Sequence, residues 1–491
     1  MAEATQVQRY ERAKDELERV GQAHVLSFYD ELDAAGQARL LDQVESVDWP
    51  EVDRLIATHV RVKPETRLPE QIEPAPWYPV EPDADLAPRY HDARKLGERL
   101  VREGKVAVFT VAGGQGTRLG WDAPKGTFPA TPIRKAPLFA IFAEAVRKMQ
   151  RKFGCTLPWY VMTSPHNDAA TRAFFAEQAW FDLDPGQITF FAQGMMPALD
   201  RDSAKVFMED RDRIALSPNG HGGSLKALAS SGAIASMQEQ GIEQISYIQI
   251  DNPHVRVIDP LFLGLHALDD AQMSSKMLPK AYPEEKLGNF CLVDGKVTII
   301  EYSDLPDELA QQRRPDGGLR FRAGSIAVHA MRVDFVASLT RAEGFSLPYH
   351  RAEKKVAHID LETGQTIRPE SANAVKLETF VFDALPLCDR SIVYETDRVE
   401  EFAPIKNAEG VDSPASSRVL QIERAARWLE AQGVAVPRRD EPVDEATGLA
   451  KVIPRAVDAT LEVRPLTAVD MTDLEKVKLP ERVEAGGELL L

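Results

Sequence analysis

The sequence predicts an α/β protein built on a doubly wound, mostly parallel sheet, with an N-terminal helical region and a small C-terminal α+β region. Three observations predict it. Short apolar, β-branched runs alternate with amphipathic helical stretches through the middle of the chain. Such βαβ units, with right-handed crossovers, place helices on both faces of a parallel sheet. Before them, the chain shows only helical periodicity and then a proline-rich stretch.

Each part of this fold has its own signal along the chain. Residues 5–60 are predicted to be helical, because their apolar residues recur at helical spacing. The proline-rich residues 64–88 are expected to form an extended connector over the surface. The parallel strands are expected at residues 105–111, 159–162, 188–191 and 245–250, the intervening helices at 138–149 and 168–178, and a late helix at 419–429. From 293 to 330 the pattern changes to shorter strands with turns, such as the hairpin at 293–302 around Asp294-Gly295, and this segment is expected to be an added antiparallel portion or insertion.

This pattern divides the chain into three predicted regions. Residues 1–95 form the helical region and connector, residues 96–390 form the sheet domain, and residues 391–491 form the C-terminal region. A chain of 491 residues is long enough for several such parts.

Composition and charge exclude several classes of function. The formal net charge of −17 disfavours binding to nucleic acid or to an anionic membrane. The three cysteines are far apart and lack metal-ligand spacing, which is typical of free thiols in a reducing compartment. No apolar stretch reaches the roughly 20 residues of a membrane span, and the N-terminus has no signal-peptide core. We therefore expect a cytoplasmic protein.

A glycine-rich loop follows the first predicted strand. Gly113, Gly114 and Gly116 allow backbone N–H groups to approach a phosphate closely, and Arg118 and Lys125 add positive charge. No Lys-Ser or Lys-Thr follows the glycines, so the loop is not a Walker loop, and it lacks the third glycine of the dinucleotide fingerprint. The order G-G-x-G-T-R-L, then P-K, looks like the loop of nucleotidyltransferases that activate sugar phosphates.

Two further features point to the same edge of the sheet. The run Gly220-His221-Gly222-Gly223 precedes an apolar-periodic helix, so it offers free N–H groups at a helix N-terminus. Asp251 directly follows the last predicted parallel strand, where ligands bind in open α/β sheets. Taken alone, such glycines often do no more than form the turns of a loop, and an aspartate at such a position more often caps a helix or stands in a turn.

Eight motifs in sequence order resemble the eukaryotic-type UDP-sugar pyrophosphorylases, and among them the UDP-N-acetylhexosamine branch. The resemblance spans roughly residues 106–418 and implies a Rossmann-like nucleotidyltransferase sheet. Its motifs are GGQGTRLG with PKG at 113–126, MTS at 162–164, FFAQGMMPAL at 190–199, SPNGHGGSLKAL at 217–228, IDN at 250–252, EYSDLP at 301–306, FVFD at 380–383 and PIKN at 404–407.

The resemblance implies a uridylyltransferase that converts UTP and a sugar 1-phosphate into UDP-sugar and pyrophosphate. The implied catalytic residues are Arg118, Lys125 and Lys406, and Asp251 is implied to hold the cofactor Mg²⁺. The implied nucleotide contacts are Gly113, Gly114, Gly116, Gln193 and Gly220; the implied sugar contacts are His221, Gly222, Gly288, Glu301, Ser325, Phe380 and Phe382.

The sequence departs from the N-acetylhexosamine pattern at two positions. His221 stands where that branch has Asn, and Gly-His-Gly is more like the UDP-glucose and broad UDP-sugar enzymes. Ser325 also stands where that branch has an Asn that faces the sugar. The aromatic pair Phe380 and Phe382 favours N-acetylglucosamine 1-phosphate, and glucose or galactose 1-phosphate is the alternative.

The expected chemistry needs positioning and charge neutralisation more than a nucleophilic side chain, because a sugar 1-phosphate is already an anionic nucleophile. Two other classes of function remain open at this point. A non-catalytic nucleotide-sugar-binding protein would lose Lys125 or Asp251, and both are present. A nucleotide-dependent kinase would need a Walker or kinase loop, which the sequence lacks.

Overall fold

The computed structural model describes residues 5–64, 69, 71–341 and 347–491. It divides into two compact units, each assembled from segments that are distant in sequence. The smaller unit comprises Met1–Leu68, Gln193–Ser224 and Ser346–Val381; the larger comprises Pro69–Ala192, Leu225–Phe345 and Phe382–Leu491. This division does not follow the three predicted regions, whose boundaries stay a prediction.

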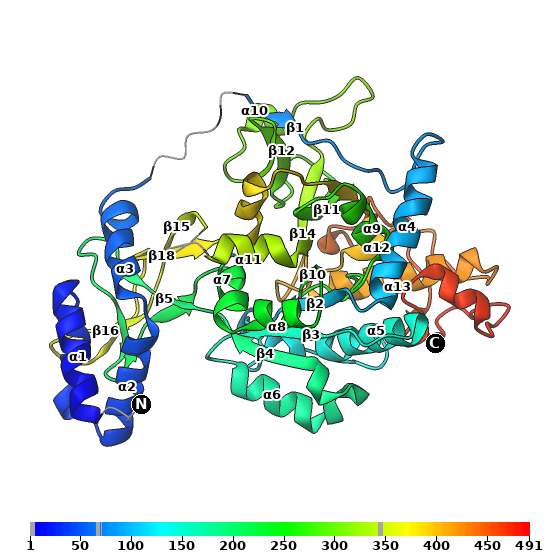
Figure 1. The fold of residues 1–491 in the computed structure, drawn as a ribbon. Coiled ribbons are helices and arrows are strands. Elements are labelled where there is room, and N and C mark those ends of the chain that lie inside the picture. The colour runs from blue at the N-terminus through cyan, green and yellow to red at the C-terminus, as the bar shows by residue number, and fades with distance from the viewer. Residues whose placement is uncertain (1–4, 65–68, 70, 342–346) are drawn as a thin grey trace. The chain divides into compact units, whose positions relative to one another are not determined.

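A ten-stranded mixed sheet lies at the centre of the larger unit, counted over the residues that the structure describes (Figure 1). Its strands are β1 (Glu73–Pro74), β2 (Val106–Val111), β3 (Trp159–Thr163), β4 (Ile188–Ala192), β10 (Gln244–Gln249), β11 (Met273–Pro279), β12 (Asn289–Val293), β13 (Lys296–Ile300), β14 (Ala323–Arg332) and β19 (Val393–Glu395).

The four strands predicted from the sequence form the parallel half of this sheet, in the order β10-β2-β3-β4. The other half is largely antiparallel, because β14 runs antiparallel to β10, β11 and β12. An α/β fold is therefore confirmed, but the sheet as a whole is mixed. The predicted hairpin is β12–β13, and Asp294 and Gly295 turn it with positive φ values of 50° and 75°.

Helices pack on one face of the parallel half, and aromatic side chains of the strands pack together on the other. On one face, Val106 and Val108 of β2 join a buried apolar cluster with residues of α4, α5, α6 and α9. On the other face, Phe109 packs against Phe191 and Tyr247. The helices of this unit are α4 (Ala87–Arg102), α5 (Leu138–Phe153), α6 (Asp168–Glu177), α8 (Ala233–Glu239), α9 (Pro260–Leu268), α10 (Asp307–Ala310), α11 (Val333–Arg341), α12 (Arg398–Glu401) and α13 (Pro414–Ala431).

The C-terminal segment packs on α13 in the larger unit. The chain ends there in a parallel pair of short strands, β20 (Thr460–Glu462) and β21 (Glu488–Leu490). Leu461 of β20 is fully buried with Ala426 and Leu429 of the helix. The predicted helix over 419–429 is part of α13, whose Ser413 closes a capping box at its N-terminus.

The smaller unit packs three helices on short strands. Leu17, Leu40 and Trp49 share a buried apolar cluster with Val375 and Leu377. The predicted N-terminal helices are α1 (Gln6–Arg19), α2 (Ala34–Ser46) and α3 (Trp49–Leu55), and they are confirmed. The strands are β5 (Met195–Pro197), β6 (Leu199–Asp200), β7 (Met208–Asp210), β8 (Arg213–Ile214), β9 (Leu216–Pro218), β15 (Tyr349–Lys354), β16 (His358–Ile359), β17 (Thr366–Ile367) and β18 (Ala374–Thr379); α7 (Gly223–Ser230) spans the boundary between the units.

Residues 65–68 and 70 of the predicted connector lie outside the described residues. The described part of the connector contains only β1 before α4 begins at Ala87, so no long regular element interrupts it there. No described helix is long and apolar enough to cross a bilayer.

Candidate active site

The glycine loop leaves the carboxyl end of β2 and folds back on itself. The N–H of Gly116 donates to Ala123 O at 3.0 Å, and the N–H of Lys125 donates to Gly114 O at 3.1 Å. The Asn167 side-chain amide donates to Ala112 O at 3.0 Å. A Cβ on Gly116 would lie 2.7 Å from the Trp121 side chain, so packing requires glycine there. The loop therefore has a fixed shape.

Three consecutive backbone N–H groups of this loop face no acceptor among the residues that the structure describes. They belong to Gly113, Gly114 and Gln115. A Cβ added to Gly114 would meet no atom within 4 Å, so the fold itself does not require glycine at that position. Successive free N–H groups in an open turn form an anion-binding concavity. The geometry suits a phosphate group that approaches the backbone closely.

Lys125 faces Asp251 across the parallel edge of the sheet. Its Nζ lies 4.0 Å from an Asp251 carboxylate oxygen, and each side chain is about one-seventh exposed, at 16% and 14%. Burial lowers the pKa of Lys125, Asp251 opposes this effect, and the positive charges of Lys406 and Arg118 lower the pKa further. The three predicted catalytic cations and the predicted metal ligand are therefore electrostatic neighbours.

Backbone hydrogen bonds join Asp251 to the segment that carries Lys406. The N–H of Ile405 donates to Asp251 O at 2.8 Å. The next residue of the strand edge, Asn252, is buried; its Nδ2 donates to Glu401 O at 2.7 Å, and its Oδ1 accepts from Ala403 N at 2.9 Å. The two segments are thus held side by side, which sets the position of Lys406 relative to Asp251.

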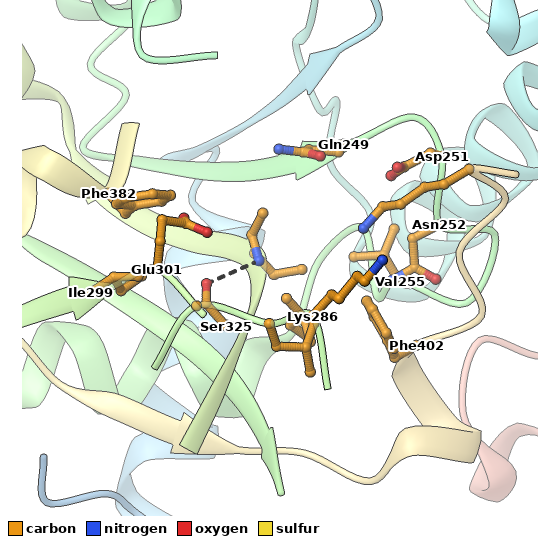
Figure 2. Close-up of a pocket in the computed structure, with 16 residues that line it drawn as sticks. Gln249, Asp251, Asn252, Val255, Lys286, Ile299, Glu301, Ser325, Phe382 and Phe402 are labelled. Carbon is orange, nitrogen blue, oxygen red and sulfur yellow. Dashed lines mark hydrogen bonds between the residues drawn. The ribbon is translucent and has the colours of Figure 1, made fainter. Parts of the chain in front are cut away.

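A pocket opens beside this junction, and Figure 2 shows the residues that line it. Asp251 and Asn252 lie on one side of it, whereas Glu301, Ile299 and Phe382 lie on the other. The lining residues are Gln249, Asp251, Asn252, Val255, Lys286, Leu287, Gly288, Ile299, Glu301, Ser325, Ile326, Ala327, Val328, Phe382, Phe402 and Lys406. Five of the predicted sugar-side and phosphate-side contacts gather here: Gly288, Glu301, Ser325, Phe382 and Lys406.

The side of the pocket that carries Glu301 and Phe382 is built on closely packed strands. The N–H of Ser325 donates to Gly288 O at 2.8 Å. A Cβ on Gly288 would lie 2.6 Å from the Ile299 methyl group and 3.5 Å from a Glu301 oxygen, so glycine keeps this wall open. The hydroxyl of Ser325 accepts from Ala327 N at 3.4 Å (Figure 2). Its hydrogen therefore stays available to donate to a ligand.

The remaining predicted residues belong to the smaller unit, and they include the second glycine loop. Gly220 has a φ of +82°, and a Cβ there would lie 2.3 Å from Thr379 O. The N–H of Val381 donates to Nδ1 of His221 at 3.2 Å, which leaves the hydrogen of the neutral ring on Nε2. The His221 ring stacks on Phe380 with ring centroids 5.2 Å apart.

Gly222 and Gln193 complete the smaller unit's set. A Cβ on Gly222 would lie 2.6 Å from Phe380 N, so this position also requires glycine. Gln193 directly follows β4, at the start of a segment of the smaller unit. Phe380 contacts His221 and His350, whereas Phe382 belongs to the larger unit and lines its pocket. The two phenylalanines that the sequence analysis paired therefore have different surroundings.

Two residues of this site, Asn252 and Lys286, were not predicted from the sequence. Asn252 stands inside the IDN motif, but its contact with Glu401 joins positions 149 residues apart and has no local signal. Lys286 also lines the pocket, and an isolated lysine two residues before a glycine has no diagnostic pattern. The structure locates both through contacts that are remote in sequence.

The carboxylates of the site are sparse. Across the described ranges, no group of three or more His, Cys, Asp or Glu side chains is arranged to hold a metal ion. Asp251 lies beside Lys125 and Lys406, whereas the carboxylate of Glu301 lies on the other side of the pocket (Figure 2). Where one carboxylate binds Mg²⁺, substrate phosphate oxygens and waters usually complete its coordination.

Comparisons with known proteins show which family the chain is similar to. Residues 59–436 match the family model described as UTP–glucose-1-phosphate uridylyltransferase. The UDP-N-acetylhexosamine pyrophosphorylase-like protein 1 of Mus musculus is 33% identical over 500 residues, which cover 94% of this chain and 97% of that protein. The UDP-N-acetylglucosamine pyrophosphorylase of Saccharomyces cerevisiae is 36% identical over 350 residues, or 70% of this chain and 73% of that protein.

A solved structure resembles nearly the whole chain. It is the crystal structure of the uridine diphosphate N-acetylglucosamine pyrophosphorylase from Trypanosoma brucei in complex with inhibitor, with a TM-score of 0.78, 25% identity and 98% coverage of both chains. The resemblance inferred from the ordered motifs is therefore confirmed. The chain belongs to the UTP–glucose-1-phosphate uridylyltransferase family.

Proposed function

We propose that this protein transfers the uridylyl group of UTP to a sugar 1-phosphate, most favourably N-acetylglucosamine 1-phosphate, and releases pyrophosphate. One observation carries the proposal. Asp251 lines the pocket and also lies 4.0 Å from Lys125, which follows the glycine loop. A nucleotide phosphate on the loop and a sugar in the pocket would therefore meet at this carboxylate.

The reaction that fits these groups is an in-line displacement. A phosphate oxygen of the sugar 1-phosphate attacks the α-phosphorus of UTP, and the bond to the pyrophosphate oxygen breaks. The free N–H groups of Gly113 and Gly114, with Arg118 and Lys125, would bind the triphosphate and neutralise the leaving pyrophosphate. Lys406 would stabilise the charge that spreads over the transferred group. Preorganised charges of this kind supply the catalysis, since no side-chain nucleophile is needed.

Mg²⁺ is proposed as the cofactor, with Asp251 as its protein ligand. The donor set fits, because one carboxylate completed by substrate phosphate oxygens is the usual way in which Mg²⁺ is held beside a nucleotide. When bound, the ion would supply positive charge next to the transferring phosphoryl group. Lys125 would remain a separate cation at this position, and the carboxylate of Asp251 would orient both.

The residues of the smaller unit are proposed to bind the uracil and to border the sugar. The side-chain amide of Gln193 suits the donor and acceptor edge of the base, and Gly220 would offer a backbone contact to it. His221, stacked on Phe380, would present its Nε2 hydrogen to the ligand, next to Gly222. The stacked pair would give a flat apolar wall with one donor at its rim.

The sugar itself is proposed from the pocket and the relatives together. Glu301 would accept hydrogen bonds from sugar hydroxyls, Ser325 would donate one, and Phe382 would face the N-acetyl group. The relatives compared above are named for N-acetylhexosamine or N-acetylglucosamine, whereas the family model is named for glucose. The serine at 325 and the histidine at 221 keep glucose or galactose 1-phosphate as the second candidate.

The doubly wound arrangement of the sheet and a cytoplasmic location are also proposed. The parallel half of the sheet, with its ligand edge at the ends of β2 and β10, supports a doubly wound, Rossmann-like arrangement. A cytoplasmic location is proposed from the three scattered cysteines, which are free thiols in the structure.

A pyrophosphate-release assay tests the function directly. The purified protein is given UTP and Mg²⁺ with N-acetylglucosamine, glucose or galactose 1-phosphate in turn, and kcat/KM is compared. We expect the highest value for N-acetylglucosamine 1-phosphate, loss of turnover on chelation, and recovery when Mg²⁺ is restored. Absence of turnover with all three sugars would refute the proposal, and a preference for glucose or galactose would select the second candidate.

A further inference from the structure

Lys286 reaches into the pocket from the loop between β11 and β12. Figure 2 shows its ammonium group on the side of the pocket where Asp251 and Asn252 lie, away from Glu301 and Phe382. Within the described part of the chain, no hydrogen bond or ion pair involves this ammonium group. A long, charged side chain thus ends in the pocket with its three donors available.

The backbone on both sides of Lys286 is anchored. Glu285 pairs with Arg398 at 2.6 Å and accepts the N–H of Ala281 at 2.7 Å. On the other side, Leu287 is buried in the apolar core. Arg398 begins α12, which leads into the segment that carries Lys406. The ion pair therefore ties the loop of Lys286 to the segment of Lys406, so the fold presents both lysines from fixed backbone.

The charges that line the pocket do not suit a dianionic ligand without Lys286. The lining contains the carboxylates of Asp251 and Glu301 and the ammonium groups of Lys286 and Lys406. With Lys406 alone, two carboxylates would outnumber one cation. A phosphate monoester brings about −1.5 to −2 further charges at neutral pH. Lys125 is already close to Asp251. Lys286 gives the pocket a second ammonium group, beside that of Lys406, and this group has no hydrogen-bond or ion-pair partner among the described residues.

We propose that Lys286 is a substrate-binding residue that holds the phosphate of the sugar 1-phosphate, an inference that rests on the proposed uridylyl transfer. Lys286 lines the same pocket as Gly288, Glu301 and Ser325, whereas none of the loop glycines 113, 114 and 116 lines it. It therefore belongs to the sugar-phosphate side rather than to the triphosphate side. The phosphate it holds provides the attacking oxygen and becomes the β-phosphate of the UDP-sugar. Pyrophosphate leaves from the opposite side of the α-phosphorus, away from Lys286.

Steady-state kinetics of Lys286→Ala and Lys286→Arg, with UTP and sugar 1-phosphate varied separately, test this role. We expect Lys286→Ala to raise KM for the sugar 1-phosphate about 10- to 100-fold, as expected for loss of one charge-assisted hydrogen bond. KM for UTP should change less than about twofold in the same variant. Lys286→Arg should restore most of the affinity. Lys95→Ala, an exposed lysine on α4 outside the pocket, is the matched control.

The reverse reaction and a neutral ligand sharpen the test. Lys286→Ala should raise KM for UDP-sugar and leave KM for pyrophosphate unchanged, and inhibition by free N-acetylglucosamine should be the same in variant and parent. If Lys286→Ala leaves KM for the sugar 1-phosphate unchanged, or raises KM for UTP as much as KM for the sugar 1-phosphate, the proposed role of Lys286 is wrong. The proposed uridylyl transfer is not affected by either result. If the parent protein turns over no sugar 1-phosphate, the proposed function fails and this inference fails with it.

Discussion

The backbone N–H of Ile405 donates a 2.8 Å hydrogen bond to the carbonyl oxygen of Asp251. Lys406 is the next residue after Ile405, so this bond sets the distance between the proposed metal ligand and a proposed catalytic lysine. Asn252 adds two hydrogen bonds between the same segments. The site therefore depends on a backbone junction as well as on its charged side chains.

Replacement of Asn252 by Ala should weaken this junction. The variant leaves Glu401 O and Ala403 N without their buried partners, which should cost about 1–3 kcal/mol of stability. We expect a lower thermal midpoint and a lower kcat, because Lys406 is held less firmly beside Asp251. Thermal unfolding and pyrophosphate release measure the two effects. Parent-like values of both would contradict the positioning role of Asn252.

Lys125→Ala should remove most of the activity and leave the fold intact. Removal of one preorganised donor beside a developing charge costs roughly 10²–10³ in kcat. The side chain is only partly exposed, so circular dichroism and the thermal midpoint should be compared with the parent. Lys95→Ala on α4 is the control for loss of one positive charge. Near-normal turnover of Lys125→Ala would remove this residue from the mechanism.

As pH is raised, the activity should begin to fall at a lower pH than it would if Lys125 had the ordinary pKa of lysine. Burial, with Lys406 and Arg118 nearby, lowers the pKa of Lys125 against the opposing effect of Asp251. The charged form is therefore lost as pH rises through a pKa below the usual lysine value. Because kcat/KM for UTP reports the free enzyme, this ratio should be measured from about pH 7 to 11.

Lys125→Arg serves as the comparison for this pH dependence. A guanidinium stays charged throughout the range, so the alkaline fall should move to higher pH even if the maximum rate is lower. Both enzymes use the same UTP, so ionisation of the substrate cancels in the comparison. Identical alkaline limbs in the two enzymes would show that another group controls the fall.

Two glycines of the loop should respond differently to alanine. A Cβ on Gly114 meets nothing within 4 Å, so Gly114→Ala should keep the parent thermal midpoint but raise KM for UTP, because a phosphate can no longer approach the backbone. A Cβ on Gly116 would lie 2.7 Å from Trp121, so Gly116→Ala should lower the thermal midpoint as well. Unchanged UTP kinetics in Gly114→Ala would argue against a phosphate at this loop.

A buried ion cluster supports the segment beyond Asn252. Nζ of Lys276 is fully buried and lies 2.6 Å from Asp259 and 2.5 Å from Glu401. Lys276→Met would leave two buried carboxylates with less compensation and should cost about 3–5 kcal/mol. Urea unfolding at neutral pH measures this loss, and the exposed Lys95→Met is the control. A change below about 1 kcal/mol would show that the cluster contributes little.

The loss of stability in Lys276→Met should change with pH in a defined direction. Although burial opposes it, Lys276 and Arg256 hold the pKa of Asp259 below its ordinary value. In the parent, that stabilisation is present above the unfolded carboxyl pKa and is lost as pH falls through the lower folded pKa. In Lys276→Met the Asp259 carboxyl protonates more readily, so the loss of stability should be smaller near pH 5 than near pH 7. A deficit that grows on acidification would contradict this.

Local patterns were sufficient to predict the parallel strands and the first helices. Residues 105–111 and 245–250 are short runs made mostly of apolar residues, and both become buried strands of the same sheet half. The hairpin was predicted because Asp294-Gly295 accepts positive φ. An antiparallel portion at 293–330 was predicted, but its pairing was not, since β14 pairs with β10, β11 and β12 through contacts that no local period encodes.

The sequence by itself determined the family and the chemical types at the ligand edge, because ordered motifs and loop glycines are local signals. Only the tertiary structure decided that Lys125, Asp251 and Lys406 converge, and that Lys286 joins Lys406 at the pocket. It also separated the surroundings of Phe380 and Phe382, which are adjacent at strand spacing in the sequence. The physical reason is that long-range packing and backbone hydrogen bonds, such as Asn252 to Glu401, select which distant residues meet.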